Sequence, residues 1–438
     1  MTFILRLAKV GLRFLYLFLR PLPLKNKVVF FSRQSSTIPL DFTLLAQEIQ
    51  TQSPETEIVY FCRKMRRKTN VFSYCLFILH SLYHLATASI AVTDTYSIQL
   101  CVLRPKRGQT VVQVWHAVGA VKQFSYQCLD KPGGQPAALA RAMEMHKNYD
   151  YFIGGAPVWN KYYAEAFNID ESRILNYGLP RIDYLIKTQD SNRAKFFEEF
   201  PGLIGKKIVL YAPTFRKKMK SHWQDILRAS KYDDIIIIVK NHPGQIMGTN
   251  KKSKNIYYMD KWQTIDLIAV CDYMITDYSS IALEAAVLKK RTMFWTYDFD
   301  EYMENSGINI DLKKEMPGNM SDNIDEIMYR IENDIYDEGQ QEQYIEKYLP
   351  AEMGKSTERI AGLAIELMPG WQADTAEDQE TGRDEVRDNG RRQRKPLEAP
   401  FGSFQAFSGS GRRASDMQDD KAAAYSDIGE LGDNRNIS

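Results

Sequence analysis

The fold is decided by the stretch Ile235-Ile236-Ile237-Ile238-Val239-Lys240-Asn241-His242-Pro243-Gly244. Four consecutive isoleucines followed by valine are typical of a parallel strand that is buried on both faces. The Pro-Gly pair then ends the strand abruptly. The stretch therefore predicts an α/β domain and places His242 at the carboxyl-terminal edge of a sheet, where open α/β folds bind ligands.

Short apolar runs separated by helical patterns extend on both sides of this strand, and they fall into two series. Strands that alternate with helices predict parallel sheets with covered faces. We therefore predict two Rossmann-like α/β domains, residues 25–195 and 196–370. The predicted strands are 28–32, 57–62, 89–93, 110–114, 151–154 and 174–177 in the first series, and 208–211, 235–239, 256–258, 273–275 and 292–295 in the second.

Composition limits the classes of function. A chain of 438 residues is too long for one hydrophobic core. A net charge of +2 argues against nucleic acid as a partner. The five cysteines are scattered singly, which favours a reducing, cytoplasmic compartment. From about Trp371 the sequence turns to charged and small polar residues, so we predict a disordered tail over 371–438.

The apolar N-terminus, residues 1–24, carries Arg6, Lys9, Arg13 and Arg20 within roughly 60° of one another on a helical wheel. Inside a bilayer each charge would cost about 2.5–3.5 kcal/mol, whereas an interfacial helix leaves the charges among anionic headgroups. We predict an amphipathic helix that holds the protein peripherally on the cytoplasmic side of the cell membrane. A helix docked on the protein's own surface is the alternative.

The first cluster that carries chemistry is Trp115-His116-Ala117-Val118-Gly119-Ala120-Val121-Lys122, which follows a predicted strand. An imidazole at this edge can accept a proton from an attacking hydroxyl at neutral pH. Gly119 keeps the turn open, and Lys122 offers a charge for phosphate. Taken alone, a histidine after a strand is more often a structural residue.

The second domain supplies charge at its own strand ends. His242, with Asn241 before it, occupies a position equivalent to that of His116. Arg216 follows the strand 208–211 and can hold phosphate oxygens bidentately. Two histidines at corresponding strand ends favour a functional role more strongly than a single histidine does.

A strand, tight turn and helix are predicted around Thr276-Asp277-Tyr278-Ser279-Ser280. Exposed backbone N–H groups at such a helix start suit a diphosphate, and Glu284 one turn later can accept hydrogen bonds from ribose hydroxyls. Helix capping by the serines is the simpler alternative. No Walker loop, GxGxxG fingerprint, HExxH motif or zinc-spaced Cys/His set is present, which disfavours ATP-driven motors, dehydrogenases and zinc hydrolases.

In this combination and order the motifs resemble the CDP-glycerol glycerophosphotransferase family of teichoic acid synthesis, over residues 28–365. The resemblance implies a GT-B-like fold of two facing Rossmann-type domains. It also implies transfer of glycerol phosphate from CDP-glycerol to a lipid-linked saccharide, with release of CMP. The sequence contains no compelling pair of carboxylates for a metal ion, so we predict no required catalytic metal, and we expect no cofactor. Two strings carry part of the resemblance: Trp-His-Ala-x-Gly-Ala-x-Lys and Tyr177-Gly-Leu-Pro-Arg-Ile-Asp183. The first string looks more like the primase branch of the family.

By this resemblance His116 is the base for the acceptor hydroxyl, on the side where Trp115, Gly119 and Lys122 lie. The resemblance assigns binding of the donor's phosphates to the second domain. The residues implied there are Arg216, Asn241, His242, Thr276, Asp277, Ser279 and Ser280, with Glu284 for the ribose.

Three other interpretations stay open at this point. A GT-B glycosyltransferase that uses a nucleotide sugar would share the fold, and a CDP-ribitol-dependent enzyme would share the chemistry. A membrane-docked scaffold on a transferase fold is the non-enzymatic alternative. Whether the protein forms a homo-oligomer is undecided by the sequence.

Overall fold

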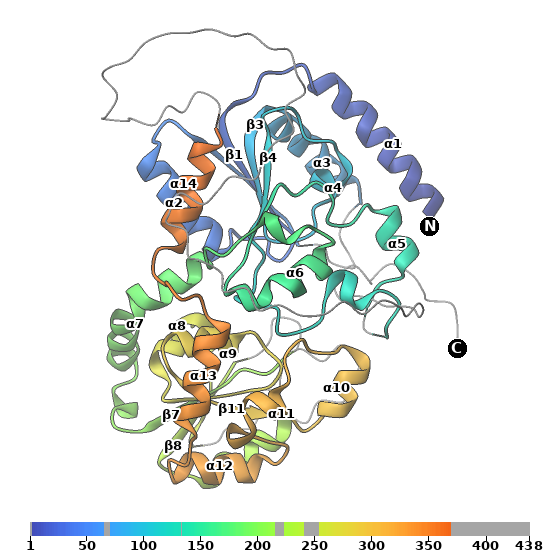
Figure 1. The fold of residues 1–438 in the computed structure, drawn as a ribbon. Coiled ribbons are helices and arrows are strands. Elements are labelled where there is room, and N and C mark those ends of the chain that lie inside the picture. The colour runs from blue at the N-terminus through green and yellow to red at the C-terminus, as the bar shows by residue number, and fades with distance from the viewer. Residues whose placement is uncertain (1, 65–70, 133, 215–222, 241–253, 369–438) are drawn as a thin grey trace, which may run out of the picture.

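The computed structural model describes residues 2–64, 71–132, 134–214, 223–240 and 254–368. These residues form two α/β lobes, one above the other in Figure 1, each built on a parallel sheet covered by helices. The prediction of two parallel-sheet domains is therefore confirmed. The predicted tail, 371–438, lies outside the described residues.

The sheet of the first lobe has the order β2-β1-β3-β4-β5-β6, and every pairing is parallel. The chain moves outward from β1 in both directions, so the crevice beside β1 and β3 is the switch point where such sheets bind ligands. The strands are β1 (Lys25–Ser32), β2 (Glu57–Cys62), β3 (Ala88–Thr93), β4 (Thr110–Gln113), β5 (Tyr151–Ile153) and β6 (Ile174–Leu175).

The sheet of the second lobe has the order β12-β11-β10-β7-β8-β9, again entirely parallel. All five residues of β8 are buried, as the run of isoleucines predicts. The two-residue strand β12 was not predicted, because so short a run has no periodicity. The strands are β7 (Lys207–Tyr211), β8 (Ile235–Val239), β9 (Ile256–Tyr258), β10 (Tyr273–Thr276), β11 (Arg291–Trp295) and β12 (Met320–Ser321).

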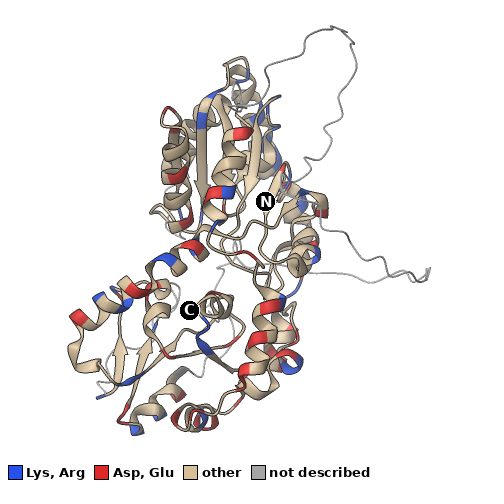
Figure 2. Cartoon of the chain, turned by 60° about the vertical axis from the view of Figure 1, so that its left-hand side comes forward, with Lys and Arg blue, Asp and Glu red and all other residues tan. Residues whose placement is uncertain are grey.

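Helices connect successive strands in both lobes, and charged residues lie mainly on these helices and on loops (Figure 2). In the first lobe they are α1 (Thr2–Leu19), α2 (Leu40–Gln52), α3 (Val71–Thr87), α4 (Ile98–Val102), α5 (Ala137–Ala142) and α6 (Asn160–Phe167), followed by the connecting helix α7 (Pro180–Glu199). The rest are α8 (Thr264–Val270), α9 (Ile281–Val287), α10 (Phe299–Asn305), α11 (Leu312–Glu315), α12 (Ile324–Glu332), α13 (Glu338–Tyr348) and α14 (Ser356–Glu366). Short 3₁₀ segments are η1 (Ser125–Cys128), η2 (Pro157–Trp159), η3 (Glu171–Arg173), η4 (Pro201–Leu203), η5 (Trp223–Lys231) and η6 (Pro317–Asn319).

The last described helix, α14, returns to the first lobe and packs against α2 (Figure 1). Asp183 in α7 fixes this return, because its carboxylate accepts hydrogen bonds from the backbone N–H groups of Ser356 and Thr357 at 3.1 and 2.7 Å. Gly178 is needed beside it: its φ is +78°, and a Cβ there would lie 2.6 Å from the Ser356 hydroxyl. Sequence periodicity assigned residues 196–370 to one domain, whereas the structure packs α14 on the other.

Candidate active site at the facing strand edges

His116 lies just beyond β4 at the carboxyl-terminal edge of the first sheet. Its Nδ1 is 2.9 Å from the backbone carbonyl oxygen of Asp94, which follows β3. A carbonyl oxygen can only accept, so Nδ1 carries the proton and Nε2 keeps its lone pair. The side-chain nitrogen of Gln34, which follows β1, lies 3.3 Å from Nε2 and donates to it. Three neighbouring strand ends thus orient one imidazole as a base.

The backbone before this imidazole is held in an unusual conformation. Trp115 has a φ of +53°, which is rare for a bulky residue. Its N–H donates to the Gln113 side-chain oxygen at 2.9 Å, and its indole stacks on Phe124 with ring centroids 4.8 Å apart. Its ring also meets Phe167 edge-on at 5.0 Å. Such strain persists only where the surroundings determine it, and it is concentrated at functional sites.

Asp94 adds a buried carboxyl group behind His116. Its side chain accepts hydrogen bonds from the hydroxyls of Ser32 at 2.8 Å and Thr95 at 3.1 Å. Burial raises the pKa of Asp94 to about 7, although these two hydrogen bonds act in the opposite direction. Sequence reasoning missed Asp94 and Gln34, and their position directly after two predicted strands was the available signal.

The loop after β4 also joins the two lobes. A Cβ on Gly119 would lie 2.5 Å from the Leu283 side chain of α9 and 2.6 Å from the Trp159 ring. Glycine is therefore required by close approach between lobes rather than by an open turn. The backbone of Lys122 forms an isolated antiparallel bridge with Ile308 of the second lobe. The two lobes consequently meet at this loop.

In the second lobe, the side chains of Thr276 and Asp277 hold the segment after β7. The backbone N–H of Thr214 donates to both carboxylate oxygens of Asp277, at 2.9 and 3.0 Å. The Thr276 hydroxyl donates to the carbonyl of Ala212 at 2.7 Å. Both side chains are buried. They therefore position the chain that leads toward Arg216, and phosphate binding by the two residues stays a prediction.

Ser279 and Ser280 are half-buried at the start of α9. The Ser279 hydroxyl accepts a hydrogen bond of 3.4 Å from Ile281 N–H, and Ser280 is the N-cap residue, without a capping hydrogen bond from its side chain. Binding of a diphosphate by these serines stays a prediction. The positions of Arg216, Asn241 and His242 lie outside the described residues.

Glu284 is buried on α9 and is engaged by Arg181, whose guanidinium Nη1 lies 3.0 Å from its carboxylate. The same guanidinium binds Asp41 of α2, with Nε 2.9 Å from Oδ2. Burial raises the pKa of Glu284, whereas Arg181 opposes that rise. The ribose role of Glu284 stays a prediction, and its observed contact with Arg181 ties α9 to the first lobe.

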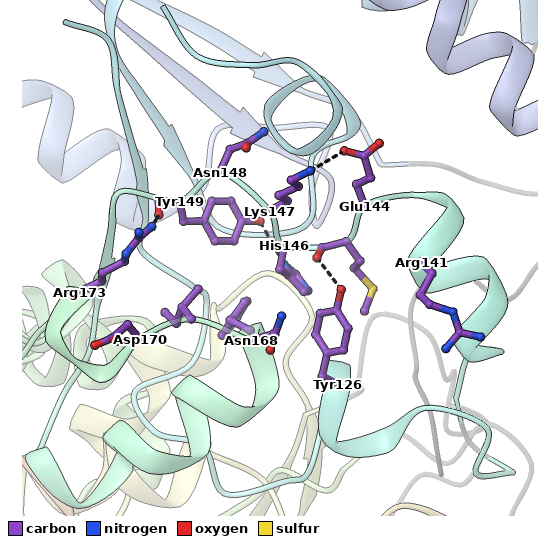
Figure 3. Close-up of a pocket in the computed structure, with 13 residues that line it drawn as sticks. Tyr126, Arg141, Glu144, His146, Lys147, Asn148, Tyr149, Asn168, Asp170 and Arg173 are labelled. Carbon is purple, nitrogen blue, oxygen red and sulfur yellow. Dashed lines mark hydrogen bonds and ion pairs between the residues drawn. The ribbon is translucent and has the colours of Figure 1, made fainter. Parts of the chain in front are cut away.

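A separate open cavity of about 490 Å³ lies on the first lobe between the loop 144–149 and the loop after α6 (Figure 3). Its polar side chains bind other groups of the cavity lining: Lys147 pairs with Glu144 at 3.2 Å, and Arg173 donates to the backbone carbonyl of Tyr149 at 2.8 Å. It contains neither His116 nor any part of α9. We therefore assign the candidate site to the facing strand edges.

Two kinds of feature are absent from the described residues. No helix among them is both long enough and apolar enough to cross a bilayer. Nor do they contain a group of three or more His, Cys, Asp or Glu side chains able to hold a metal ion.

Residues 14–366 match the family model described as CDP-Glycerol:Poly(glycerophosphate) glycerophosphotransferase. The chain belongs to this family. The predicted family is thus confirmed, and the protein is a transferase of teichoic acid synthesis.

This glycerophosphotransferase family member is 32% identical over 379 residues to a teichoic acid ribitol-phosphate primase of Bacillus spizizenii, covering 82% of this chain and 96% of the relative. It is 27% identical over 248 residues to a teichoic acid glycerol-phosphate primase of Bacillus subtilis, covering 55% and 64%. The solved structure of the wall teichoic acid polymerase TagF superimposes with a TM-score of 0.63 at 19% identity, covering 83% of this chain and 96% of that one. The GT-B-like fold is confirmed by this likeness.

Proposed function

We propose that this protein transfers an alditol phosphate from a CDP-activated alditol to a lipid-linked saccharide at the cytoplasmic face of the membrane, releasing CMP. The observation that carries the proposal is the orientation of His116, whose Nδ1 binds the Asp94 carbonyl so that Nε2 is the basic nitrogen. Family membership supports the choice of reaction, because a base of this kind assists the attack of an acceptor hydroxyl on the diphosphate of a CDP-activated donor.

In the proposed step, Nε2 of His116 accepts the proton of the acceptor hydroxyl as its oxygen attacks the β-phosphorus of the donor. The new bond joins that oxygen to phosphorus, and the bond between the β-phosphorus and the bridging oxygen breaks. The electron pair leaves with CMP. Positioning and electrostatic stabilisation supply most of the rate enhancement in reactions of this type.

The residues proposed for the donor side belong to the second lobe. Arg216 and His242 would neutralise charge on the departing CMP, with Asn241 beside them. Ser279 and Ser280 would bind the diphosphate. Support comes from the close contact of Gly119 with α9, since it brings the acceptor-side loop within reach of a donor held there.

Two donors are candidates. The family description favours CDP-glycerol. The similarity to a ribitol-phosphate primase over 96% of that relative favours CDP-ribitol. The same full-length match supports a single addition, since the chain covers only 59% of a poly(ribitol-phosphate) polymerase from the same organism.

The test is incubation of the full chain with a lipid-linked disaccharide and either CDP-glycerol or CDP-ribitol, followed by mass measurement of the lipid product. We expect the lipid to gain one alditol phosphate with one donor and to gain little with the other. A product that contains an added sugar and no added phosphorus would instead identify a glycosyltransferase. No product with either donor, from a protein that binds neither, would contradict the proposal.

A further inference from the structure

Gln34 follows β1 and directly faces the base of the proposed reaction. Its side-chain nitrogen lies 3.3 Å from Nε2 of His116, the nitrogen that keeps a lone pair because Nδ1 donates to the Asp94 carbonyl. An amide nitrogen can only donate, so the contact is a hydrogen bond from Gln34 to the neutral imidazole. An amide of the protein therefore holds the place that an acceptor hydroxyl must take to lose its proton.

A buried network fixes the backbone that carries this amide. The Gln34 N–H donates to the Ser32 hydroxyl at 3.2 Å. The Arg33 N–H donates to the Thr95 hydroxyl, also at 3.2 Å. Both hydroxyls donate in turn to the carboxyl group of Asp94, at 2.8 and 3.1 Å, and all three of these side chains are buried. The loop after β1 is thus tied to the same residue whose carbonyl orients the imidazole.

We propose that Gln34 is a positioning residue of the proposed reaction, which holds the imidazole until the acceptor hydroxyl displaces its amide nitrogen. Hydrogen bonding to the neutral form of a group disfavours the charged form, so this contact keeps the resting base unprotonated. When the hydroxyl arrives, its proton passes to Nε2. Gln34 then turns its amide oxygen toward the new N–H, because a protonated nitrogen can no longer accept. The inference rests on the proposed function, since it needs His116 to act as the base.

Residue 34 can be changed without changing the other charges around the imidazole. The charged side chains at this edge of the first sheet come from three neighbouring elements and from the loop of the imidazole itself. They are Arg33 after β1, Asp41 in α2, Asp94 after β3 and Lys122. Asp41, and Glu284 of the facing helix α9, are both paired with Arg181. A charge introduced at residue 34 is therefore the only charge that differs between a variant and the wild type.

The reactivity of the imidazole at different pH values tests the contact without any transfer. Only the neutral imidazole reacts with diethyl pyrocarbonate, and His116 is half-buried and open to the reagent. Mass spectrometry of the peptide that contains residue 116 gives the pH midpoint of its modification. Gln34→Glu puts a carboxylate beside the imidazole, and a nearby opposite charge favours the protonated form. We expect the midpoint, and with it the acid limb of the pH–rate profile, to rise by about one pH unit.

Three further variants serve as controls. Gln52→Glu makes the same substitution at the far end of α2, where the exposed Gln52 donates to Glu48, and it should leave the midpoint unchanged. Gln34→Met keeps the length of the side chain without the hydrogen bond or a charge. It should lower turnover while moving the midpoint less than Gln34→Glu does. In an Asp94→Asn background, which lacks the neighbouring carboxyl group, Gln34→Glu should raise the midpoint as it does in the wild type.

An unchanged midpoint for Gln34→Glu in both backgrounds would overturn the inference. So would an equal rise for Gln52→Glu, because the added charge would then act at long range and not through the contact. A raised midpoint together with normal turnover by His116→Ala would place the failure in the proposed function, since the contact would exist without serving a base.

A second inference concerns Asn309, which lies in the second lobe between α10 and α11. Its backbone N–H donates to the Val121 carbonyl at 2.8 Å. Its side-chain nitrogen donates to the carbonyl oxygens of Ala120 and Lys122, at 2.8 and 3.2 Å. Its side-chain oxygen accepts a hydrogen bond of 3.0 Å from Gln127. One residue of the second lobe thus holds three consecutive residues of the loop that follows the base.

Neighbouring contacts extend this pairing between the lobes. The Gln123 N–H donates to the Gly307 carbonyl at 3.1 Å, and Lys131 donates to the Gln123 side-chain oxygen at 2.6 Å. The same loop touches α9 at Gly119, so its position sets how far the base lies from a donor bound at that helix. We infer that Asn309 is a second positioning residue of the proposed reaction, which aligns the base in one lobe with the donor in the other.

Asn309→Ala tests this role against Asn305→Ala, which removes an asparagine that donates within its own helix. Misplacement of a reacting group lowers the rate of the chemical step, so we expect Asn309→Ala to lower turnover at saturating donor by about tenfold or more. The calorimetric affinity for the donor should change little. Hydrogen exchange should become faster in peptides that cover residues 119–123. The control variant should change none of these quantities.

Equal turnover by Asn309→Ala and Asn305→Ala would overturn this second inference. A loss of donor affinity in proportion to the loss of turnover would do so as well, because the residue would then serve donor binding. Faster exchange in residues 119–123 of a protein that transfers nothing even as the wild type would contradict only the proposed function.

Discussion

The carboxyl-terminal edges of the two sheets use polar residues in different ways. In the first lobe, the Asp94 carbonyl and the Gln34 amide both point at the imidazole of His116. In the second lobe, the carboxylate of Asp277 and the hydroxyl of Thr276 bind backbone groups of the neighbouring loop. In the proposed reaction, the first edge therefore orients the base, whereas the second edge holds the loop that precedes the residues proposed to bind the donor. Variants of the two edges should accordingly affect different steps.

The largest effect is expected at the first edge. His116→Ala should lower turnover by about 10² to 10⁴, the usual contribution of a general base, while leaving the affinity for the CDP-alditol donor largely intact. Calorimetric titration with the donor beside a transfer assay separates the two quantities. Weakened donor binding with normal turnover at saturation would mean that the imidazole acts on the donor instead.

The next largest effect is expected from breaking the contact between the lobes. Arg181→Met leaves the carboxylates of Asp41 and Glu284 buried without their cation, and breaking a buried pair in this way costs about 3–5 kcal/mol of unfolding free energy. Urea denaturation measures it. The control is Lys313→Met, which removes an exposed partner of Asp300 and should cost less than about 1 kcal/mol. Equal stability of the two variants would show that Arg181 does not hold the lobes together.

At the second edge, Asp277→Ala removes the acceptor of the buried Thr214 N–H. A buried donor left without a partner costs about 1–3 kcal/mol. Because the same loop leads toward Arg216, we also expect the KM for the donor to rise while the pH–rate profile keeps its shape. A changed acid limb with an unchanged KM would reverse the roles assigned to the two edges.

The effect confined to one pH window is the pH dependence of stability contributed by Asp94. Its pKa is about 7 in the folded protein, above the value of an unfolded aspartate, so the folded state binds the extra proton between about pH 4 and pH 7. Unfolding free energy should therefore fall as pH rises through this window, by up to about 1.4 kcal/mol per unit. Asp94→Asn should remove that slope in urea titrations at several pH values. If Asp94→Asn kept a slope as large as that of the wild type, the pH dependence of stability would belong to another titratable group.

Much of the site could be predicted because strand ends are visible in the sequence. The isoleucine run of β8 and the apolar run before Trp115 each mark a strand, and parallel strands bring the residues that follow them to one edge. Gln34 was missed although it follows a predicted strand, because a single glutamine in a loop belongs to no motif with a distinctive spacing. Arg181 was noticed only as part of a family segment, since its partners Asp41 and Glu284 are 140 and 103 residues away.

The sequence by itself determined that α1 is a helix with one basic and one apolar side, because side-chain periodicity is a local property. It also determined the α/β class through the alternation of strands and helices. Only the tertiary structure decided which side of α1 faces outward, since that depends on Glu144, which the fold brings from 131 residues away to Arg13. The same holds for α14, whose attachment to the first lobe is set by Asp183, 173 residues from Ser356. Such contacts depend on how the chain crosses between lobes, and no local pattern encodes that path.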